Sequence, residues 1–98
     1  MAYTIDQFSK ITNINKLVLR TWENRYGLLK AKRTSTNIRI YSDKLLVKAL
    51  NIKLLIDNGY KISFISKKSH LDLIKMIDEI KLNQESKLGE YYYINKFI

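Results

Sequence analysis

Two short amphipathic segments separated by only four residues occupy the first quarter of the chain. In the first segment, Ile5 and Phe8 recur at helical spacing. The hydroxyl of Thr4 precedes Gln7 by three residues, which is the spacing of a capping box. The pattern predicts a helix over about residues 5–11, followed almost at once by a second helix.

The second segment begins after Asn15, a favourable N-cap residue, and ends at Gly27, where a helix often needs a left-handed residue. It predicts a helix over residues 16–26. The apolar side of this helix carries Leu19, Trp22 and Tyr26, and the polar side carries Lys16, Arg20, Glu23 and Asn24. Two short helices joined in this way, the second one basic on its outer face, form a helix-turn-helix.

The hydrophobic period changes in residues 28–41. Basic residues lead into a polar run at 34–37, and Ile38 and Ile40 then alternate with Arg39 and Tyr41. This pattern predicts a small β-hairpin with a polar tip and a basic edge, which is called a wing when it lies beside a helix-turn-helix. The expected fold class is mainly α, a winged helix-turn-helix with a small β-hairpin wing.

A strongly apolar segment follows the wing. Ser42 and Asp43 are its N-cap residues, and residues 44–58 are apolar over most of the helical circumference. We expect this helix to be the core helix of the domain, buried on several sides. Ser63 is expected to cap one more short turn, over residues 64–68.

The C-terminal part predicts two further helices. Ser69 caps a helix over about residues 70–82, and residues 83–86 form a polar break. A second helix is expected from Lys87, with a stripe of Leu88, Tyr91 and Tyr92. Because the chain stops on two apolar residues, we expect a longer protein that continues past Ile98.

The charge is strongly uneven along the chain. The 98 residues contain 18 Lys and Arg against 9 Asp and Glu, and the excess lies entirely in the first 70 residues. All four arginines fall between Arg20 and Arg39. Guanidinium can form two hydrogen bonds to a phosphate or a guanine edge, so this concentration favours a surface that binds a polyanion.

Several classes of function are excluded or disfavoured by composition. The chain has no Cys, and its one His is His70, so thiolate catalysis and sulfur-ligated metal sites are impossible and no metal site is expected. Asp78 and Glu79 are adjacent and form no acid/base pair, so we do not expect an enzyme. The apolar runs are far too short to span a membrane, so a cytoplasmic protein with no membrane partner is expected.

Five short motifs occur in a characteristic order. They are Tyr3-Thr4-Ile5, Leu19-Arg20-Thr21-Trp22-Glu23, Tyr26-Gly27-Leu28-Leu29, Arg39-Ile40-Tyr41-Ser42 and Asp57-Asn58-Gly59-Tyr60. Together they resemble the DNA-binding domain of the MerR family of bacterial transcription regulators, over about residues 3–65. The form of residues 22–27 is most similar to the CarA/CarH-like branch of carotenoid repressors.

The resemblance and the helix-turn-helix geometry together predict which residues contact double-stranded DNA. The N-terminal part of the second helix would enter the major groove, the wing would grip the backbone or minor groove, and the segment after Gly59 would touch a flanking phosphate. The predicted DNA contacts are Asn15, Lys16, Arg20 and Thr21 in the helix, Arg33, Arg39 and Tyr41 in the wing, and Lys61. Trp22, Glu23 and Gly27 are expected to be structural at this site, with Glu23 orienting Arg20 or another basic residue.

Three positions depart from the family pattern. Ala31 replaces the usual Pro, Thr21 replaces a common aromatic residue, and Asn37 occupies a frequent Gly position that Asn also tolerates. In the similar branch a cobalamin-binding domain follows, but no cofactor is expected within residues 1–98. The resemblance further implies a homodimer on a palindromic promoter element, with RNA polymerase as a further partner.

We therefore divide the chain into a winged helix-turn-helix DNA-binding domain, residues 1–69, and a helical extension, residues 70–98, that starts a dimerisation or sensor region. Two alternatives remain open. An excisionase-like or architectural DNA-binding protein would share the topology, and a protein-interaction module could use the basic face on an acidic partner. The second alternative leaves the clustering of the arginines unexplained.

Overall fold

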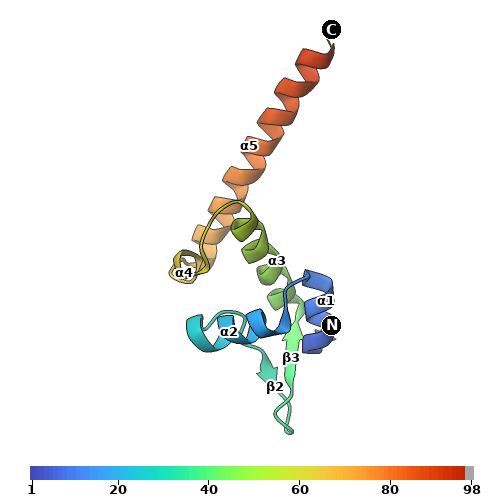
Figure 1. The fold of residues 1–98 in the computed structure, drawn as a ribbon, viewed down its shortest axis with the longest axis vertical. Helices are drawn as coiled ribbons and strands as arrows, with labels where there is room; N and C mark the ends of the chain where they lie inside the picture. Colours follow the sequence, from blue (N-terminus) through green and yellow to red (C-terminus); the bar gives the residue numbers. More distant parts are fainter. Residues whose placement is uncertain (97–98) are drawn as a thin grey trace.

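A computed structural model describes the backbone of residues 1–96 and the side chains of residues 1–83. Helices dominate this part of the chain, and the strands are short (Figure 1). In chain order the elements are β1 (Ala2–Tyr3), α1 (Ile5–Thr12), α2 (Lys16–Tyr26), β2 (Lys32–Arg33), β3 (Arg39–Ser42), α3 (Asp43–Asp57), α4 (Ile62–Ile65) and α5 (His70–Lys96). The mainly α fold class with a small wing is confirmed.

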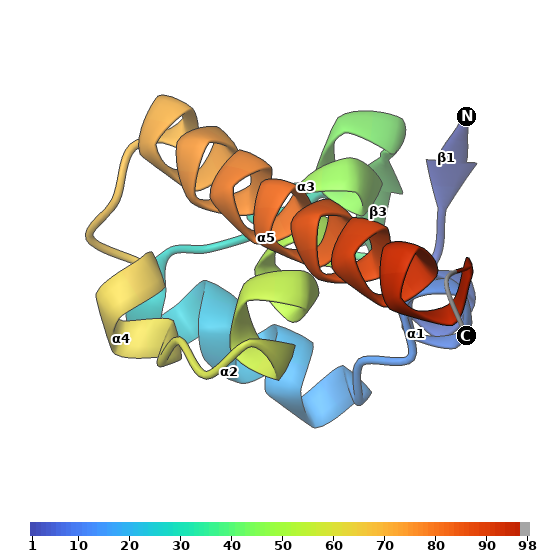
Figure 2. The same ribbon diagram turned by 90° about the horizontal axis from the view of Figure 1, so that it is seen from above.

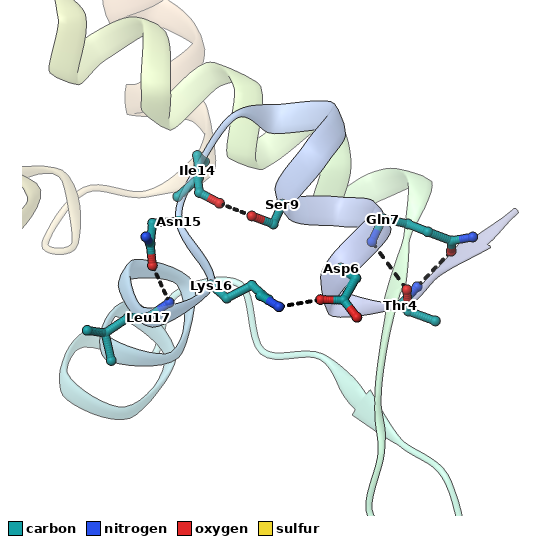
Figure 3. Close-up of polar contacts among 8 residues, drawn as sticks. All are labelled: Thr4, Asp6, Gln7, Ser9, Ile14, Asn15, Lys16 and Leu17. Carbon is teal, nitrogen blue, oxygen red and sulfur yellow. Dashed lines mark hydrogen bonds and ion pairs between the residues drawn. The ribbon is translucent and has the colours of Figure 1, made fainter.

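The first two helices begin where the sequence predicts. Thr4 Oγ1 accepts a hydrogen bond from the Gln7 backbone N–H at 3.2 Å, and Gln7 Oε1 accepts from the Thr4 N–H at 3.0 Å, which completes the capping box. Asn15 Oδ1 caps α2 by accepting from the Leu17 N–H at 2.7 Å (Figure 3). These caps are local in sequence, so the pattern alone places both helices correctly.

The wing is the antiparallel pair β2–β3, with Arg33 opposite Arg39. Asn37 at its tip has a left-handed φ of 66°, and its N–H donates to the Thr34 carbonyl at 2.8 Å. The predicted hairpin and the tolerance of Asn37 are therefore confirmed. A third strand, β1, was not predicted; it pairs with the other edge of β3, placing Tyr3 opposite Tyr41.

Tyr41 lies in the core rather than on the wing surface. Its ring is fully buried and stacks on Phe8, with 4.2 Å between the ring centroids. The prediction that Tyr41 grips DNA from the wing is therefore wrong for the ring. The physical reason is that α1 packs against β3 and Phe8 of α1 covers the Tyr41 ring, so the side of β3 that carries Tyr41 faces the core.

Helix α3 is central, but it is not covered on all sides. Its buried residues Ala49, Ile52 and Leu55 face the rest of the domain. Val47 and Leu50 remain 57% and 43% exposed, so the helix is not buried around its whole circumference, although it contacts α1, α4, α5 and β3, as the prediction of burial on several sides expects. The uncovered part of α3 is the one that carries these two apolar residues, and they stay in contact with solvent.

Two predictions about the C-terminal part are wrong. Helix α4 begins after Lys61, two residues earlier than predicted, and Ser63 does not cap it. Helix α5 runs without a break from His70 to Lys96 across the predicted break at residues 83–86. That run is polar but contains neither Pro nor Gly, and polarity alone does not stop a helix.

The predicted start of α5 is confirmed. Ser69 Oγ accepts from the Asp72 N–H at 3.2 Å, and the Asp72 carboxylate accepts from the Ser69 N–H at 3.4 Å. These hydrogen bonds lower the pKa of Asp72. The predicted stripe of Leu88, Tyr91 and Tyr92 lies outside the described side chains.

Helix α5 crosses over α3 and then extends away from the other elements (Figures 1 and 2). Leu73 and Ile77, from its first turns, belong to the same hydrophobic core as Phe8 and Tyr41. The proposed division between residues 69 and 70 remains a prediction, and the first turns of α5 pack on the N-terminal part. No helix in the described part of the chain has the length and apolar content needed to cross a membrane.

The Tyr41 hydroxyl provides a stability test. It is buried and has no hydrogen-bond partner among the described residues, and burial together with the Glu23 carboxylate raises its pKa. Because an unsatisfied buried polar group costs about 1–3 kcal/mol, Tyr41→Phe should raise the free energy of unfolding by about 1 kcal/mol. Tyr41→Ala should lower it by about 3–5 kcal/mol, because the stacked ring is lost. Urea unfolding of both variants measures the difference, and a destabilised Tyr41→Phe would show that the hydroxyl has a native partner.

Candidate nucleic-acid interface

Helix α2 has one buried side and one open side. Leu19 and Trp22 are buried in the core, which confirms the structural role predicted for Trp22. At 100° per residue, the positions opposite them are 17, 20, 21 and 24, and all four residues there are exposed. The open side therefore carries Leu17, Arg20, Thr21 and Asn24. We call these four residues the outer face of α2.

Both ends of α2 are fixed by residues that the sequence analysis named. Asn15 is exposed, and its side chain is engaged in the N-cap. Gly27 has a left-handed φ of 65° and donates its N–H to the Glu23 carbonyl at 3.1 Å. Any side chain at this position would be strained, so the structural role predicted for Gly27 is supported.

Lys16 extends toward α1 and forms an ion pair with Asp6 (Figure 3). Both side chains remain largely exposed. The Lys16 ammonium lowers the pKa of Asp6, first through the hydrogen bond and then through the charge. Lys16, a predicted DNA contact, therefore lies at the edge of the outer face, and its ammonium group is paired with Asp6 of α1.

The Glu23 carboxylate links α2 to the wing. Glu23 Oε1 lies 3.1 Å from Arg33 Nη2 and 3.4 Å from Arg39 Nε, and Oε2 accepts from the Ala31 N–H at 3.3 Å. Only 12% of the Glu23 side chain is exposed, so these interactions are screened much less than surface pairs. Glu23 thus orients two basic residues, and neither of them is Arg20. We call this group the Glu23 clasp.

The clasp changes what the wing arginines present to the surface. Arg33 also donates from Nη1 to the Asn37 carbonyl at 3.3 Å, and it stays half-exposed. The Arg39 side chain is mostly covered, so its role is chiefly in the clasp. Lys30 and Lys32 are exposed on the same ribbon, although the sequence analysis did not place them among the DNA contacts. Their charge and the alternating wing pattern could have identified them.

Lys61 lies at a separate part of the surface. It is exposed at the N-cap of α4. Next to it, Tyr60 and Phe64 stack with 5.9 Å between ring centroids, and Lys68 Nζ lies 4.6 Å from the Phe64 ring centroid. The structure thus brings Arg20 and Thr21 together on the outer face of α2, places Asn15 at its N-cap, and leaves Lys61 as an outlying basic position.

Leu17 is the residue of the outer face that sequence reasoning missed. It is 67% exposed, although its type suggests burial. Its position three residues before Arg20 and opposite Leu19 and Trp22 on the helix could have identified it. Among residues whose side chains are described, no cluster of His, Cys, Asp and Glu could hold a metal ion.

Residues 3–72 match a family model described as MerR HTH family regulatory protein. The regulator MlrA of Escherichia coli strain K12, described as an HTH-type transcriptional regulator, is 41% identical over 61 residues, which are 62% of this chain and 25% of MlrA. The HTH-type transcriptional repressor CarH of Myxococcus xanthus is 32% identical over 62 residues, 63% of this chain and 21% of CarH. The chain therefore spans at most a quarter of the length of these relatives.

A solved structure has the same fold. It is that of HiNmlR, described as a MerR family regulator lacking the sensor domain and bound to promoter DNA. Its TM-score is 0.65 at 17% sequence identity, and the alignment covers 92% of this chain and 75% of HiNmlR. Because only 17% of the aligned residues are identical, this similarity shows a common fold and nothing about individual residues.

Removing the Glu23 charge should loosen the wing. In Glu23→Gln the amide keeps the size of the side chain but loses the charge that holds two arginines. Because hydrogen bonds to charged groups contribute about 1.5–3 kcal/mol, we expect the free energy of unfolding to fall by about 1–2 kcal/mol. Amide hydrogen exchange in residues 31–39 should also be faster in Glu23→Gln than in the wild type, and this increase should be larger there than in the rest of the chain.

The matched control is Glu79→Gln on α5, which makes the same charge change at an exposed position away from the wing. It should leave exchange in residues 31–39 unchanged. Equal exchange in wild type and Glu23→Gln would contradict the clasp.

The Asp6–Lys16 pair should contribute to stability only above the acid range. The pKa of Asp6 in the folded chain is lowered from its ordinary value of 3.8, so its contribution is present above that value and is lost as pH falls through the lowered pKa. Chemical unfolding should show a larger difference between wild type and Asp6→Asn at about pH 6 than at about pH 2. In a Lys16→Gln background the same difference should be smaller, because only the weaker influence of Lys10 and Arg20 on Asp6 remains, and a pH-independent difference would count against the pair.

Proposed function

The chain belongs to the MerR HTH family of regulatory proteins, and on this basis we propose that it binds double-stranded promoter DNA sequence-specifically and regulates transcription. The outer face of α2 would lie in the major groove, and the wing would contact the backbone or minor groove. HiNmlR, which has the same fold, is described as bound to promoter DNA.

One observation carries the proposal. The outer face of α2 places Arg20 among exposed residues, while the Glu23 clasp keeps the basic wing at a set position beside the same helix. Groove contacts and backbone contacts must be made at the same time, so the helix and the wing need a defined separation. The excess of 9 positive charges supplies the attraction to a polyanion.

The other parts of the proposal concern partners. By family membership the working unit would be a homodimer in the cytoplasm, with RNA polymerase as a further partner. We propose no enzymatic activity and no cofactor for residues 1–98, and a sensor domain such as a cobalamin-binding one would lie outside them. The DNA-binding part would comprise residues 1–69 and the extension residues 70–98.

Selection of bound duplexes from a random DNA pool at moderate salt tests the proposal. Enrichment of an inverted repeat supports a dimeric regulator, and a lone half-site supports specific binding by single copies. Retention without enrichment favours an architectural DNA-binding protein. If no DNA is retained, the proposal fails and the basic face is better assigned to an acidic protein partner.

Arg20→Ala should weaken binding to the selected site by about 1–3 kcal/mol if Arg20 contacts a base edge. Binding to random DNA should weaken much less, because it relies on phosphate contacts, which are the same for all sequences, and lacks the specific base contact of Arg20. Titration of fluorescent duplexes at several salt concentrations measures both. Lys81→Ala on α5 removes the same charge at an exposed site away from α2 and should leave the preference unchanged. An equal loss on both duplexes would reduce Arg20 to a phosphate contact.

A further inference from the structure

The outer face of α2 carries one large apolar side chain that is strongly exposed. Leu17 is 67% exposed in the first turn of a helix whose other outer residues are polar. Figure 3 shows that the Lys16 side chain points to Asp6 of α1, whereas the Leu17 side chain points away from α1. Leu17 therefore has no packing role in the described chain, and its side chain is free to meet whatever α2 binds.

Thr21 lies one helical turn after Leu17 on the same face of α2 and adds a methyl group to the apolar surface. Its hydroxyl donates to the Leu17 carbonyl at 2.8 Å, a hydrogen bond within the helix. The hydroxyl is thereby engaged with the backbone, and the methyl group is the part of the side chain that remains for a ligand. Residues four apart on a helix are neighbours, so Leu17 and the Thr21 methyl lie together.

Positive charge borders this apolar pair. Arg20 is exposed beside it on the outer face, and Lys16 lies at the edge of that face. A protein partner that buried Leu17 would also have to neutralise these charges. DNA does so with its phosphates, and its major groove offers one apolar group at the base edges, the C5-methyl of thymine.

We propose that Leu17, together with the Thr21 methyl group, contacts the C5-methyl group of a thymine in the major groove and so selects thymine at that position. The inference rests on the proposed function, and it adds a residue that determines specificity through an apolar contact. Arg20 then supplies hydrogen bonds, while Leu17 distinguishes bases that differ by one methyl group.

The test replaces thymines of a selected duplex by deoxyuridine, one at a time. This change removes only the C5-methyl group and leaves the Watson–Crick pair intact. For the wild-type chain, affinity should fall about fourfold at one or two positions, the change expected when one buried methyl contact is lost. For Leu17→Ala the preference for thymine over deoxyuridine at those positions should be clearly smaller than for the wild type, and Leu17→Met should still discriminate.

Val47→Ala is the matched control, because Val47 is an exposed aliphatic residue on α3 outside the outer face of α2. It should discriminate as the wild type does. Thermal unfolding checks that each variant is folded. We expect the Leu17 variants to fold, because the Leu17 side chain is largely exposed.

Three results would overturn the inference. If every deoxyuridine duplex binds like its thymine counterpart, no methyl contact exists, although specific binding itself stands. If Leu17→Ala discriminates as strongly as the wild type, another residue makes the contact. If the wild-type chain retains no duplex during selection, the proposed function fails before any uracil comparison is made.

Discussion

The candidate interface depends on the ion pairs that the Glu23 carboxylate forms with Arg33 and Arg39. One nearly buried side chain of α2 holds two arginines and a backbone N–H of the wing segment. The wing is a two-stranded ribbon, which has little stability by itself. Its position relative to α2 is set by this clasp and by the pairing of β3 with β1. The outer face of α2 and the wing are thereby held in a defined relative position.

The basic residues of α2 and the wing fall into two groups, those paired with a carboxylate and those that are not. Arg33 and Arg39 are oriented by Glu23, and Lys16 is paired with Asp6. Arg20 makes no ion pair with any side chain that the structure describes. Its donors are therefore available without the cost of breaking an internal interaction. Beside it, an exposed leucine offers an apolar contact, so the two residues can read different features of a base pair.

The hydrophobic core connects this surface to the long C-terminal helix. Phe8 and Tyr41 stack at its centre, and Leu73 and Ile77 of α5 join the same cluster. Residues far apart in sequence thus determine how the first turns of α5 pack on the N-terminal part of the chain. Val47 and Leu50 on α3 remain outside this core and are exposed in the described chain.

The sequence by itself determined the features that depend on neighbouring residues. Both helix starts, the cap at Gly27, the left-handed Asn37 and the wing follow from capping residues and hydrophobic period, which act over a few positions. Only the tertiary structure decided that β1 joins the sheet, that Tyr41 is buried, and that Glu23 binds wing arginines rather than Arg20. Those outcomes depend on contacts between distant segments, which no local pattern specifies. The exposure of Leu17 is of the same kind, because it depends on which side of α2 the rest of the chain covers.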